Sequence, residues 1–407
     1  MSQATSPVKL SEEKLARAAF TYLAEPGDPA LGALLGICEP AEVLAAIKAD
    51  MLPGTGPGCG DSPASRAALG RALGRWRVRL SGLPDDEGIA NACSDGIRLI
   101  CPGDAEWPSP LDQLGQARPY ALWLRGSADL RLACMRSVSI VGSRAATGYG
   151  GHVAGEIAAD LAERGWAIVS GGAYGIDAAA HRGALASAGT TIVVLACGVD
   201  YPYPAGHADL FATITAEGLV VSEWPPGCRP ARMRFLVRNR AIAALACGTV
   251  IVEAGERSGA LNTARHAANL GKPLMAVPGP VTSAQSAGCH RIIREWGATC
   301  VTGAADIIEL LSPLGIPDVL APGGGLEPAS SPVSGPPGPD SMPSRDDLDT
   351  DSAKVLDALP ARGGAGTSTI AVDAGVDLDT VLRCLGRLAG YGFIERGDGG
   401  WRLRKGG

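Results

Sequence analysis

The feature that most constrains the fold begins at Ser137, where short apolar segments start to alternate with segments of helical composition. The apolar segments are rich in valine, isoleucine and leucine. Strands of this kind that alternate with helices form βαβ units, and their parallel sheet is covered by helices on both faces. We therefore predict a doubly wound, mostly parallel α/β fold. The predicted strands are residues 138–141, 166–169, 191–195, 218–221, 249–252 and 274–277.

The chain of 407 residues is long enough for two to four domains, at roughly 100–200 residues for each. Residues 1–84 are predicted to form an N-terminal helical domain, because apolar residues recur there at helical spacing. Within it, residues 28–36 resemble half of a helix-hairpin-helix unit, which contacts proteins as well as DNA. The α/β domain is predicted over 85–312. Before the alternating region we expect helices at 41–47 and 65–77, a Gly/Pro interruption at 52–60, and strands at 97–100 and 120–124.

A second composition change follows the α/β domain. Residues 313–351 are dominated by Pro, Gly, Ser and Asp, a composition typical of a disordered linker. Residues 352–407 are predicted to form a separate winged-helix-like domain, which could read duplex DNA or dock a protein. Its expected elements are helices at 354–359, 367–374 and 378–390, followed by a hairpin of 393–396 and 401–403.

Composition narrows the cellular setting. No basic segment followed by an apolar run opens the chain, and no apolar stretch is long enough to cross a membrane, so we expect a cytoplasmic protein. The 11 cysteines include no C-x-x-C pair, which is typical of reduced thiols and predicts no structural metal site. We also predict no bound cofactor.

The net charge of −6 is unevenly distributed. Residues 136–300 hold 14 Lys and Arg against 11 Asp and Glu, and residues 352–407 hold 8 against 6. The acidic excess therefore lies in the N-terminal region and the linker. Five arginines fall within twelve residues of the central region, at positions 229, 232, 234, 238 and 240.

Four loops that follow predicted strands carry residues suited to phosphate. Ligands of open parallel sheets bind beyond the carboxyl ends of the strands, where helix N-termini offer free N–H groups. Glycine lets the backbone approach closely, serine offers a hydroxyl, and arginine offers a bidentate fork. The candidate binding residues are Gly142, Ser143 and Arg144; Ser170, Gly171, Gly172, Tyr174 and Gly175; Arg238, Asn239 and Arg240; and Ser258 and Gly259.

Three titratable residues near these loops are interpreted as structural, so no catalytic residue is assigned. Asp177 is placed to cap a helix, His181 is expected to pack on that helix, and Glu253 is expected to bond neighbouring N–H groups. No G-x-G-x-x-G follows the first strand and no acidic residue ends the second, which argues against a nicotinamide dehydrogenase. A P-loop sequence is also absent.

In this order, the loops resemble the DNA-processing protein A family (DprA, also called Smf). The resemblance covers roughly residues 100–310, and each motif is weak while the set is highly specific. The matching stretches are 141–144, 170–177 with 180–181, 238–240, 252–254 with 258–259, 276–279, and 288–290 with 297–298.

The resemblance implies an extended Rossmann core that binds single-stranded DNA, forms a homodimer and delivers the recombinase RecA in natural transformation and recombination. Arg144 carries over as the best phosphate contact, with Arg238 and Arg240 as supporting positions. Some relatives have lysine where this chain has Tyr174, which leaves two interpretations: the ring stacks on a base, or it packs. Because aromatic residues make up only 4% of the chain, we expect no extended stacking platform and little sequence preference.

Two other hypotheses remain open on the sequence. The first is a Rossmann-like nucleotide-binding enzyme of the nucleoside monophosphate hydrolase type, although its P-G-G-x-G-T-x-x-E motif is absent and the nearest segment is residues 253–259. The second is a regulator that reads duplex DNA through residues 352–407. We favour the non-enzymatic single-strand binder.

Overall fold

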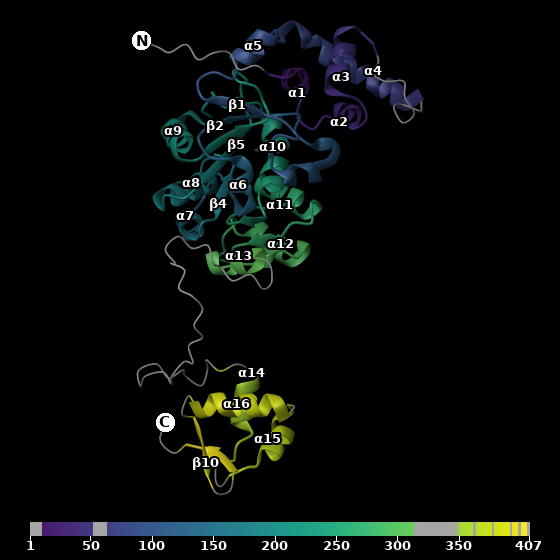
Figure 1. Ribbon diagram of the computed structural model, residues 1–407. Coiled ribbons are helices and arrows are strands. Elements are labelled where there is room, and N and C mark those ends of the chain that lie inside the picture. The colour runs from purple at the N-terminus through teal and green to yellow at the C-terminus, as the bar shows by residue number, and fades with distance from the viewer. Residues whose placement is uncertain are drawn as a thin grey trace. The chain divides into compact units, whose positions relative to one another are not determined.

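The structure is a computed structural model that describes residues 10–51, 63–312, 348, 350–360, 364–376, 378–390, 393–397 and 400–404. Its contacts divide the chain into two units, Met1–Gly324 and Gly325–Gly407 (Figure 1). The Gly/Pro interruption at 52–60 and nearly all of the predicted linker lie outside the described residues.

A single large sheet organises the first unit. In the part of the chain that is described, its strand order is β1-β2-β6-β5-β4-β3-β7-β8-β9. Neighbours from β6 through β9 pair in parallel, whereas β2 pairs antiparallel with both β6 and β1. The strands are β1 (Ile97–Ile100), β2 (Leu122–Arg125), β3 (Ser137–Val141), β4 (Ala167–Ser170), β5 (Thr191–Leu195), β6 (Leu219–Ser222), β7 (Gly248–Ile251), β8 (Leu274–Ala276) and β9 (Thr299–Cys300).

The predicted α/β fold is therefore confirmed, with each expected strand displaced by no more than a few residues. The antiparallel edge was not predicted. Neither was β9, because it has two residues and both are exposed, so its sequence lacks the apolar run that marks a buried strand.

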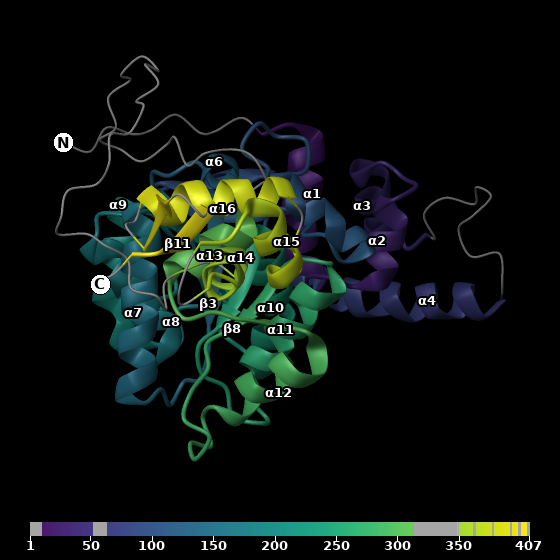
Figure 2. The same cartoon turned by 90° about the horizontal axis from the view of Figure 1, so that it is seen from below.

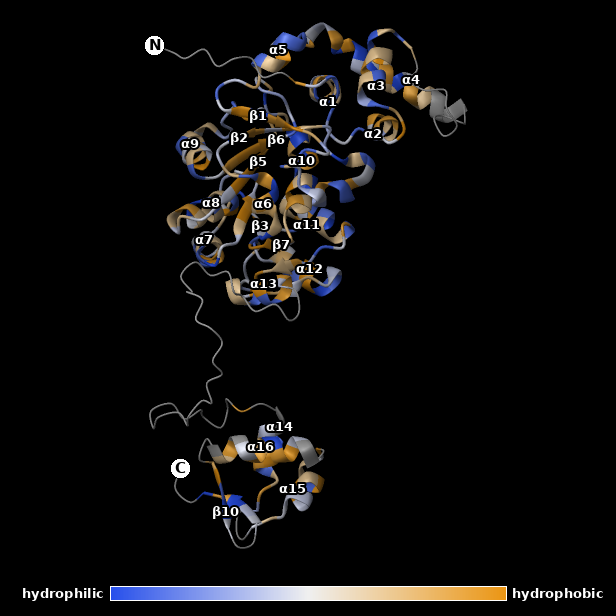
Figure 3. Ribbon diagram, viewed as in Figure 1, coloured by the Kyte–Doolittle hydropathy of each residue, from blue (hydrophilic) through white to orange (hydrophobic). Residues whose placement is uncertain are grey.

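Helices cover both faces of the sheet, and Figure 2 shows α7 (Gly148–Glu163) and α8 (Ile176–Ala186) on one side of the strands and α10 (Arg232–Leu245) and α11 (Ala260–Asn269) on the other. One face carries α7, α8, α9 (Ala208–Glu217) and α13 (Ala304–Leu311). The other carries η2 (Ser109–Ala117), α6 (Leu130–Met135), α10, α11 and α12 (Ala287–Trp296). The apolar strands run between these layers (Figure 3).

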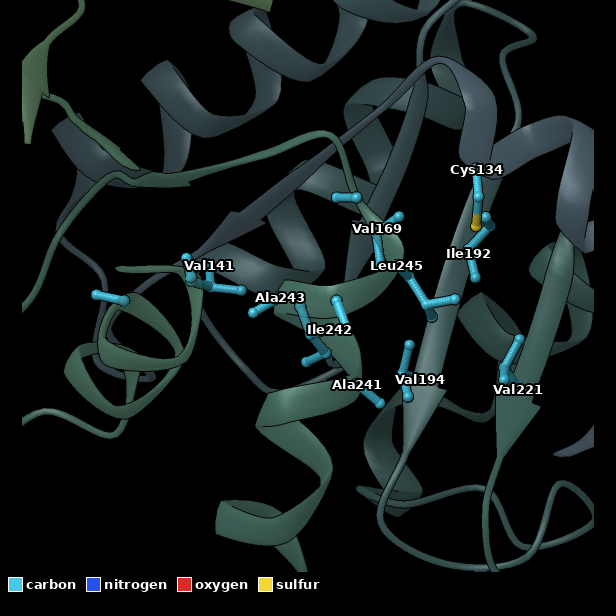
Figure 4. Packing of buried hydrophobic residues seen from close by; sticks show 14 of the residues in the cluster. Cys134, Val141, Val169, Ile192, Val194, Val221, Ala241, Ile242, Ala243 and Leu245 are labelled. Atoms are coloured by element: carbon cyan, nitrogen blue, oxygen red, sulfur yellow. The ribbon is translucent and has the colours of Figure 1, made fainter. Parts of the chain in front are cut away.

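Side chains of successive strand residues enter opposite cores, as the two-residue period of a strand requires. Ile168 packs with α7 and α8, whereas Val169 packs with α10. Figure 4 shows the second of these cores, where Ala241, Ile242 and Leu245 of α10 lie against the strands. Because both faces are buried, the strands read as continuous apolar runs.

The N-terminal helices pack on the β1–β2 edge of the sheet. They are α1 (Glu12–Leu23), α2 (Pro29–Leu35), α3 (Pro40–Lys48), α4 (Pro63–Val78), η1 (Leu80–Gly82) and α5 (Asp86–Asn91). One face of α1 buries Phe20 and Leu23 within the helical group, while Ala18 and Ala19 pack on the sheet edge. Trp123 Nε1 of β2 donates to Thr21 Oγ1 at 3.2 Å.

One charged contact fastens this helical group to α10 and to the segment after β6, and a second joins that segment to α10. Glu25, just after α1, accepts hydrogen bonds from Trp224 Nε1 at 3.0 Å and from the guanidinium of Arg234 at 3.0 and 3.2 Å. Burial alone would raise the pKa of the Glu25 carboxyl, but these hydrogen bonds hold it below its ordinary value. Deeper inside, Glu223 and Arg240 form a bidentate pair at 2.6 and 2.7 Å and are almost fully buried.

The second unit contains α14 (Thr350–Asp357), α15 (Thr367–Ala374) and α16 (Leu378–Gly390), followed by the antiparallel strands β10 (Ile394–Gly397) and β11 (Gly400–Leu403). A bridge joins Ala365 to Trp401. This is the predicted order of three helices and a hairpin, and assignment to the winged-helix class stays a prediction. Among the described residues of the chain, no helix is long and apolar enough to span a membrane.

Replacing Glu223 with glutamine should destabilise the protein by about 3–5 kcal/mol, because the Arg240 charge then stays buried without its counter-charge. Urea unfolding followed by tryptophan fluorescence measures the change. As a matched control, Glu217→Gln alters an exposed carboxylate at the end of α9 and should change stability by less than about 0.5 kcal/mol. Equal stability of the two variants would contradict the role given to the pair.

Candidate nucleic-acid interface

The candidate site lies at the switch point of the sheet. Strand β3 pairs with β4 on one side and with β7 on the other. The helix after β3 is α7 on one face of the sheet, and the helix after β7 is α11 on the opposite face, so the loops that lead to these two helices diverge. A cavity of about 410 Å³ opens there. Its lining residues are Val141, Gly142, Ser143, Arg144, Ala145, Ala173, Asp177, Phe235, Leu236, Arg238, Asn239, Ile242, Ser258, Gly259, Ala260 and Thr263.

The loop after β3 forms one wall. Ser143 N donates to Glu253 O at 2.7 Å, which ties this loop to the end of β7. A Cβ on Gly142 would lie 2.5 Å from Ile176 Cγ1 and 2.8 Å from Glu253 O, so only glycine fits between the two loops. Arg144 is exposed at the cavity mouth, with its guanidinium 5.1 Å from the ring centre of Phe235.

The loop after β4 brings the N-terminus of α8 to the cavity. Gly175 is the N-cap of α8 at φ 78°, and a Cβ there would collide with Ser143 O. Gly172 also has a positive φ of 72°, so two glycines make the turn possible. Ser170 is not at the surface: it is fully buried and donates to Ile140 O at 2.6 Å.

Tyr174 lies beside the cavity, outside the set of described residues that line it. Its ring is half-exposed and packs edge-on against His207, with ring centres 4.5 Å apart. His207 Nδ1 is 3.1 Å from Gly172 O, which places this pair on the same loop.

Arg238 is a buried structural residue of the site. Its Nη1 donates to Gly171 O at 2.6 Å and also to Val194 O, so one guanidinium binds carbonyls at the ends of β4 and β5. Burial lowers the pKa of Arg238 to about 10, opposed by the nearby Asp177 carboxylate. We therefore assign Arg238 to shaping the floor of the cavity.

The prediction that Asp177 caps a helix was wrong. Asp177 does not cap α8, because the N-cap is Gly175 and Asp177 already lies in the first helical turn. Its Oδ2 accepts instead from Ala173 N at 3.2 Å and holds the preceding loop. Burial raises the pKa of this carboxyl, while Arg238 opposes the shift.

Arg240 does not lie where a supporting phosphate contact was expected. Two residues along a helix differ by about 200° in direction, so Arg238 and Arg240 face opposite sides of α10. Arg240 is 6% exposed, is paired with Glu223 and lies outside the described lining of the cavity. The arginine run therefore serves several surfaces: Arg234 binds Glu25, while Arg229 and Arg232 are exposed.

The fourth loop supplies the opposite wall. Asn239 Nδ2 donates to Asn262 Oδ1 at 3.2 Å and to Gly259 O at 3.4 Å, which ties α10 to α11. Gly259 is the N-cap of α11, and Ser258 Oγ accepts from Ala260 N at 3.3 Å. A second helix N-terminus therefore reaches the cavity.

Glu253 and His181 are held by neighbours as expected. Thr147 donates to Glu253 from its N–H at 2.9 Å and from Oγ1 at 2.6 Å, so this carboxylate anchors the start of α7. His181 is buried in α8 with Nδ1 at 2.7 Å from Thr191 Oγ1. Within the described ranges, no group of three or more His, Cys, Asp or Glu side chains is placed to hold a metal ion.

Phe235 and Leu236 are lining residues that the sequence interpretation missed. A signal for Phe235 was present, because it precedes Arg238 by three residues and helical neighbours at that spacing share a face. The cavity thus combines the exposed cation Arg144 with the N-termini of α8 and α11.

This fold and site define an extended Rossmann-like protein with a phosphate-suited cavity at its switch point. The family model for DNA recombination-mediator protein A matches residues 98–312. The chain belongs to this family, which confirms the resemblance drawn from the sequence.

Comparisons with individual proteins support the same family. The chain is 47% identical over 324 residues to a putative DNA processing protein DprA of Mycobacterium tuberculosis, covering 77% of this chain and 78% of the relative. It is 39% identical over 202 residues to DprA of Streptococcus pneumoniae, covering 50% and 70%. The X-ray structure of the Streptococcus pneumoniae protein superposes with a TM-score of 0.58 at 28% identity, covering 75% of this chain and 99% of that chain.

His181 should make stability fall in mild acid. Burial lowers the pKa of His181 from 6.5 to about 3, and the nearby His207 lowers it further as a smaller cause. Between pH 6.5 and pH 3, the unfolded chain therefore binds a proton at this residue and the folded chain does not. Stability is full above pH 6.5 and is lost as the pH falls toward 3. Between pH 7 and pH 5, wild type should lose roughly 2 kcal/mol more than His181→Gln, measured by urea unfolding at each pH. Parallel pH dependences would show that His181 does not titrate in this way.

Proposed function

We propose that this protein binds single-stranded DNA through the switch-point cavity and delivers RecA onto the strand in homologous recombination and natural transformation. The observation that carries the proposal is the convergence of Arg144 and two helix N-termini on one open cavity. Membership in a family of DNA recombination mediators supports a DNA strand as the ligand.

The charge arrangement favours a phosphodiester. The guanidinium of Arg238 is occupied by Gly171 O and Val194 O and faces Asp177, so its charge is largely balanced inside the protein. Arg144 is exposed and lies beside the positive ends of the α8 and α11 dipoles. A bound anion therefore meets one cation and two helix ends, a combination suited to the single charge of a phosphodiester.

The shape favours a single strand. The cavity is recessed between loops, and a flexible strand can bend a nucleotide into it. A duplex keeps its bases stacked and presents its phosphates on a stiff cylinder. Contacts made mainly to the backbone carry little sequence information, so we expect weak sequence preference.

The same family membership supports two partner proposals. We infer that the protein acts as a homodimer and that it contacts RecA, as expected of a recombination mediator acting in the cytoplasm. We assign it no catalytic role, since Glu253 is bound by Thr147 and His181 by Thr191.

Arg144→Ala should weaken single-strand binding roughly tenfold or more, because a charge-assisted hydrogen bond contributes about 1.5–3 kcal/mol. Fluorescence anisotropy of a labelled oligonucleotide across a salt series, with duplex competitor, measures it. The log–log salt slope should fall by about 0.7 on loss of one phosphate contact.

A matched control is Arg164→Ala, which removes an exposed arginine at the C-terminal end of α7 and should leave affinity unchanged. Deleting residues 340–407 should also preserve binding if the core is the site. Wild-type affinity in Arg144→Ala would sink the proposed cavity, and loss of binding on the deletion would move the site to the C-terminal unit.

Delivery of RecA is measured by its strand-dependent ATP hydrolysis on strands already covered by a single-strand-binding protein. Wild type should shorten the lag before hydrolysis, and Arg144→Ala should do so much less, because it no longer holds the strand. An unchanged lag with strand-binding wild type would overturn the mediator role while leaving strand binding intact.

A further inference from the structure

A second hollow adjoins the cavity. This groove, here named the aromatic groove, has a volume of about 770 Å³. It shares Arg144, Phe235 and Leu236 with the cavity, so the two form one continuous surface. Its lining residues are Arg144, Tyr203, Pro230, Ala231, Arg232, Met233, Phe235 and Leu236.

Two aromatic rings from distant segments meet in this groove. Tyr203 comes from the segment between β5 and α9, and Phe235 from the first turn of α10. Their ring centres are 5.7 Å apart with planes inclined by 50°. Arg144 covers part of Phe235, whereas the residue Tyr203 is 41% exposed. An exposed aromatic face therefore lies directly beside the proposed strand-binding cavity.

The positive charge of the aromatic groove favours a negatively charged ligand. Arg144 and the exposed Arg232 lie on its lining, and none of the described lining residues is acidic. The N-cap of α10 is Ala231, whose side chain cannot accept a hydrogen bond from the helix N–H groups. Aromatic surface between cations fits a ligand that alternates planar rings with negative charge, which is the chemistry of a nucleotide.

We propose that the aromatic groove binds the nucleotide adjacent to the one held in the cavity. Its base stacks on Tyr203, and its phosphate lies against Arg232. This inference rests on the proposed single-strand binding and extends it: the cavity holds one nucleotide, and the groove sets the direction in which the strand leaves. Although aromatic residues are few in the chain, tertiary folding gathers two of them where a base can stack.

The test compares two labelled strands of equal length, oligo-dT and a fully abasic oligonucleotide that offers phosphates alone. Tyr203→Leu should weaken binding of oligo-dT by roughly fivefold to a hundredfold, the range expected for one stacked base. Its affinity for the abasic strand should equal that of wild type. Tyr203→Phe keeps the ring and should bind oligo-dT as wild type does.

Tyr201→Leu is the matched control, because Tyr201 lies on the same segment at 38% exposure and outside the described lining of the groove. It should bind both strands like wild type. Thermal unfolding checks that each variant is folded.

The outcomes separate this inference from the proposed function. Undiminished oligo-dT binding by Tyr203→Leu, together with weakened binding by Arg144→Ala, would overturn the groove and leave the cavity in place. Equal losses on both strands would show that Tyr203 acts structurally and would also overturn stacking. If wild type binds neither strand, single-strand binding itself fails.

Discussion

The arrangement of the site depends on the hydrogen bonds that the guanidinium of Arg238 donates to backbone carbonyls at the ends of β4 and β5. Burying an unpaired charge costs several kcal/mol, so Arg238 is tolerated only because strand-end carbonyls accept its hydrogen bonds and Asp177 lies nearby. Arg238 donates to Gly171 O, just after β4, and to Val194 O near the end of β5, and it thereby fixes α10 against the carboxyl edge of the sheet.

Because α10 is a rigid helix, fixing one of its residues places the others. Phe235 and Leu236 reach the cavity from the same helix, while Arg240 reaches Glu223 on the other side. Arg234 of the first turn binds Glu25 and so connects the N-terminal helices to the wall of the aromatic groove. One helix therefore links the position of the helical group to the residues that line the cavity and the aromatic groove.

Sequence reasoning placed three of the four predicted loops at the carboxyl edge correctly, because a glycine turn that follows a buried strand lies at the carboxyl end of that strand. The fourth prediction was wrong: residues 238–240 lie inside α10 and do not form a loop. Sequence reasoning also erred where side-chain direction matters. Arg238 and Arg240 look equivalent in the sequence, yet helical geometry sends them to opposite sides. Asp177 looked like a helix cap, but the turn ends two residues earlier, at Gly175. Such errors arise because charge and spacing identify a segment before they identify its partners.

The sequence alone determined the alternation of strands and helices, the glycine loops after β3, β4 and β7, and the family, since these follow from local composition and short motifs. Tertiary structure decided which arginine stays available to a ligand. Arg144 remains exposed, whereas Arg238 and Arg240 are held by internal carbonyls and a carboxylate. Tertiary structure also brought together the rings of Tyr203 and Phe235, two residues that are 32 positions apart in the chain. The physical reason is that burial and pairing depend on long-range packing, which no local pattern encodes.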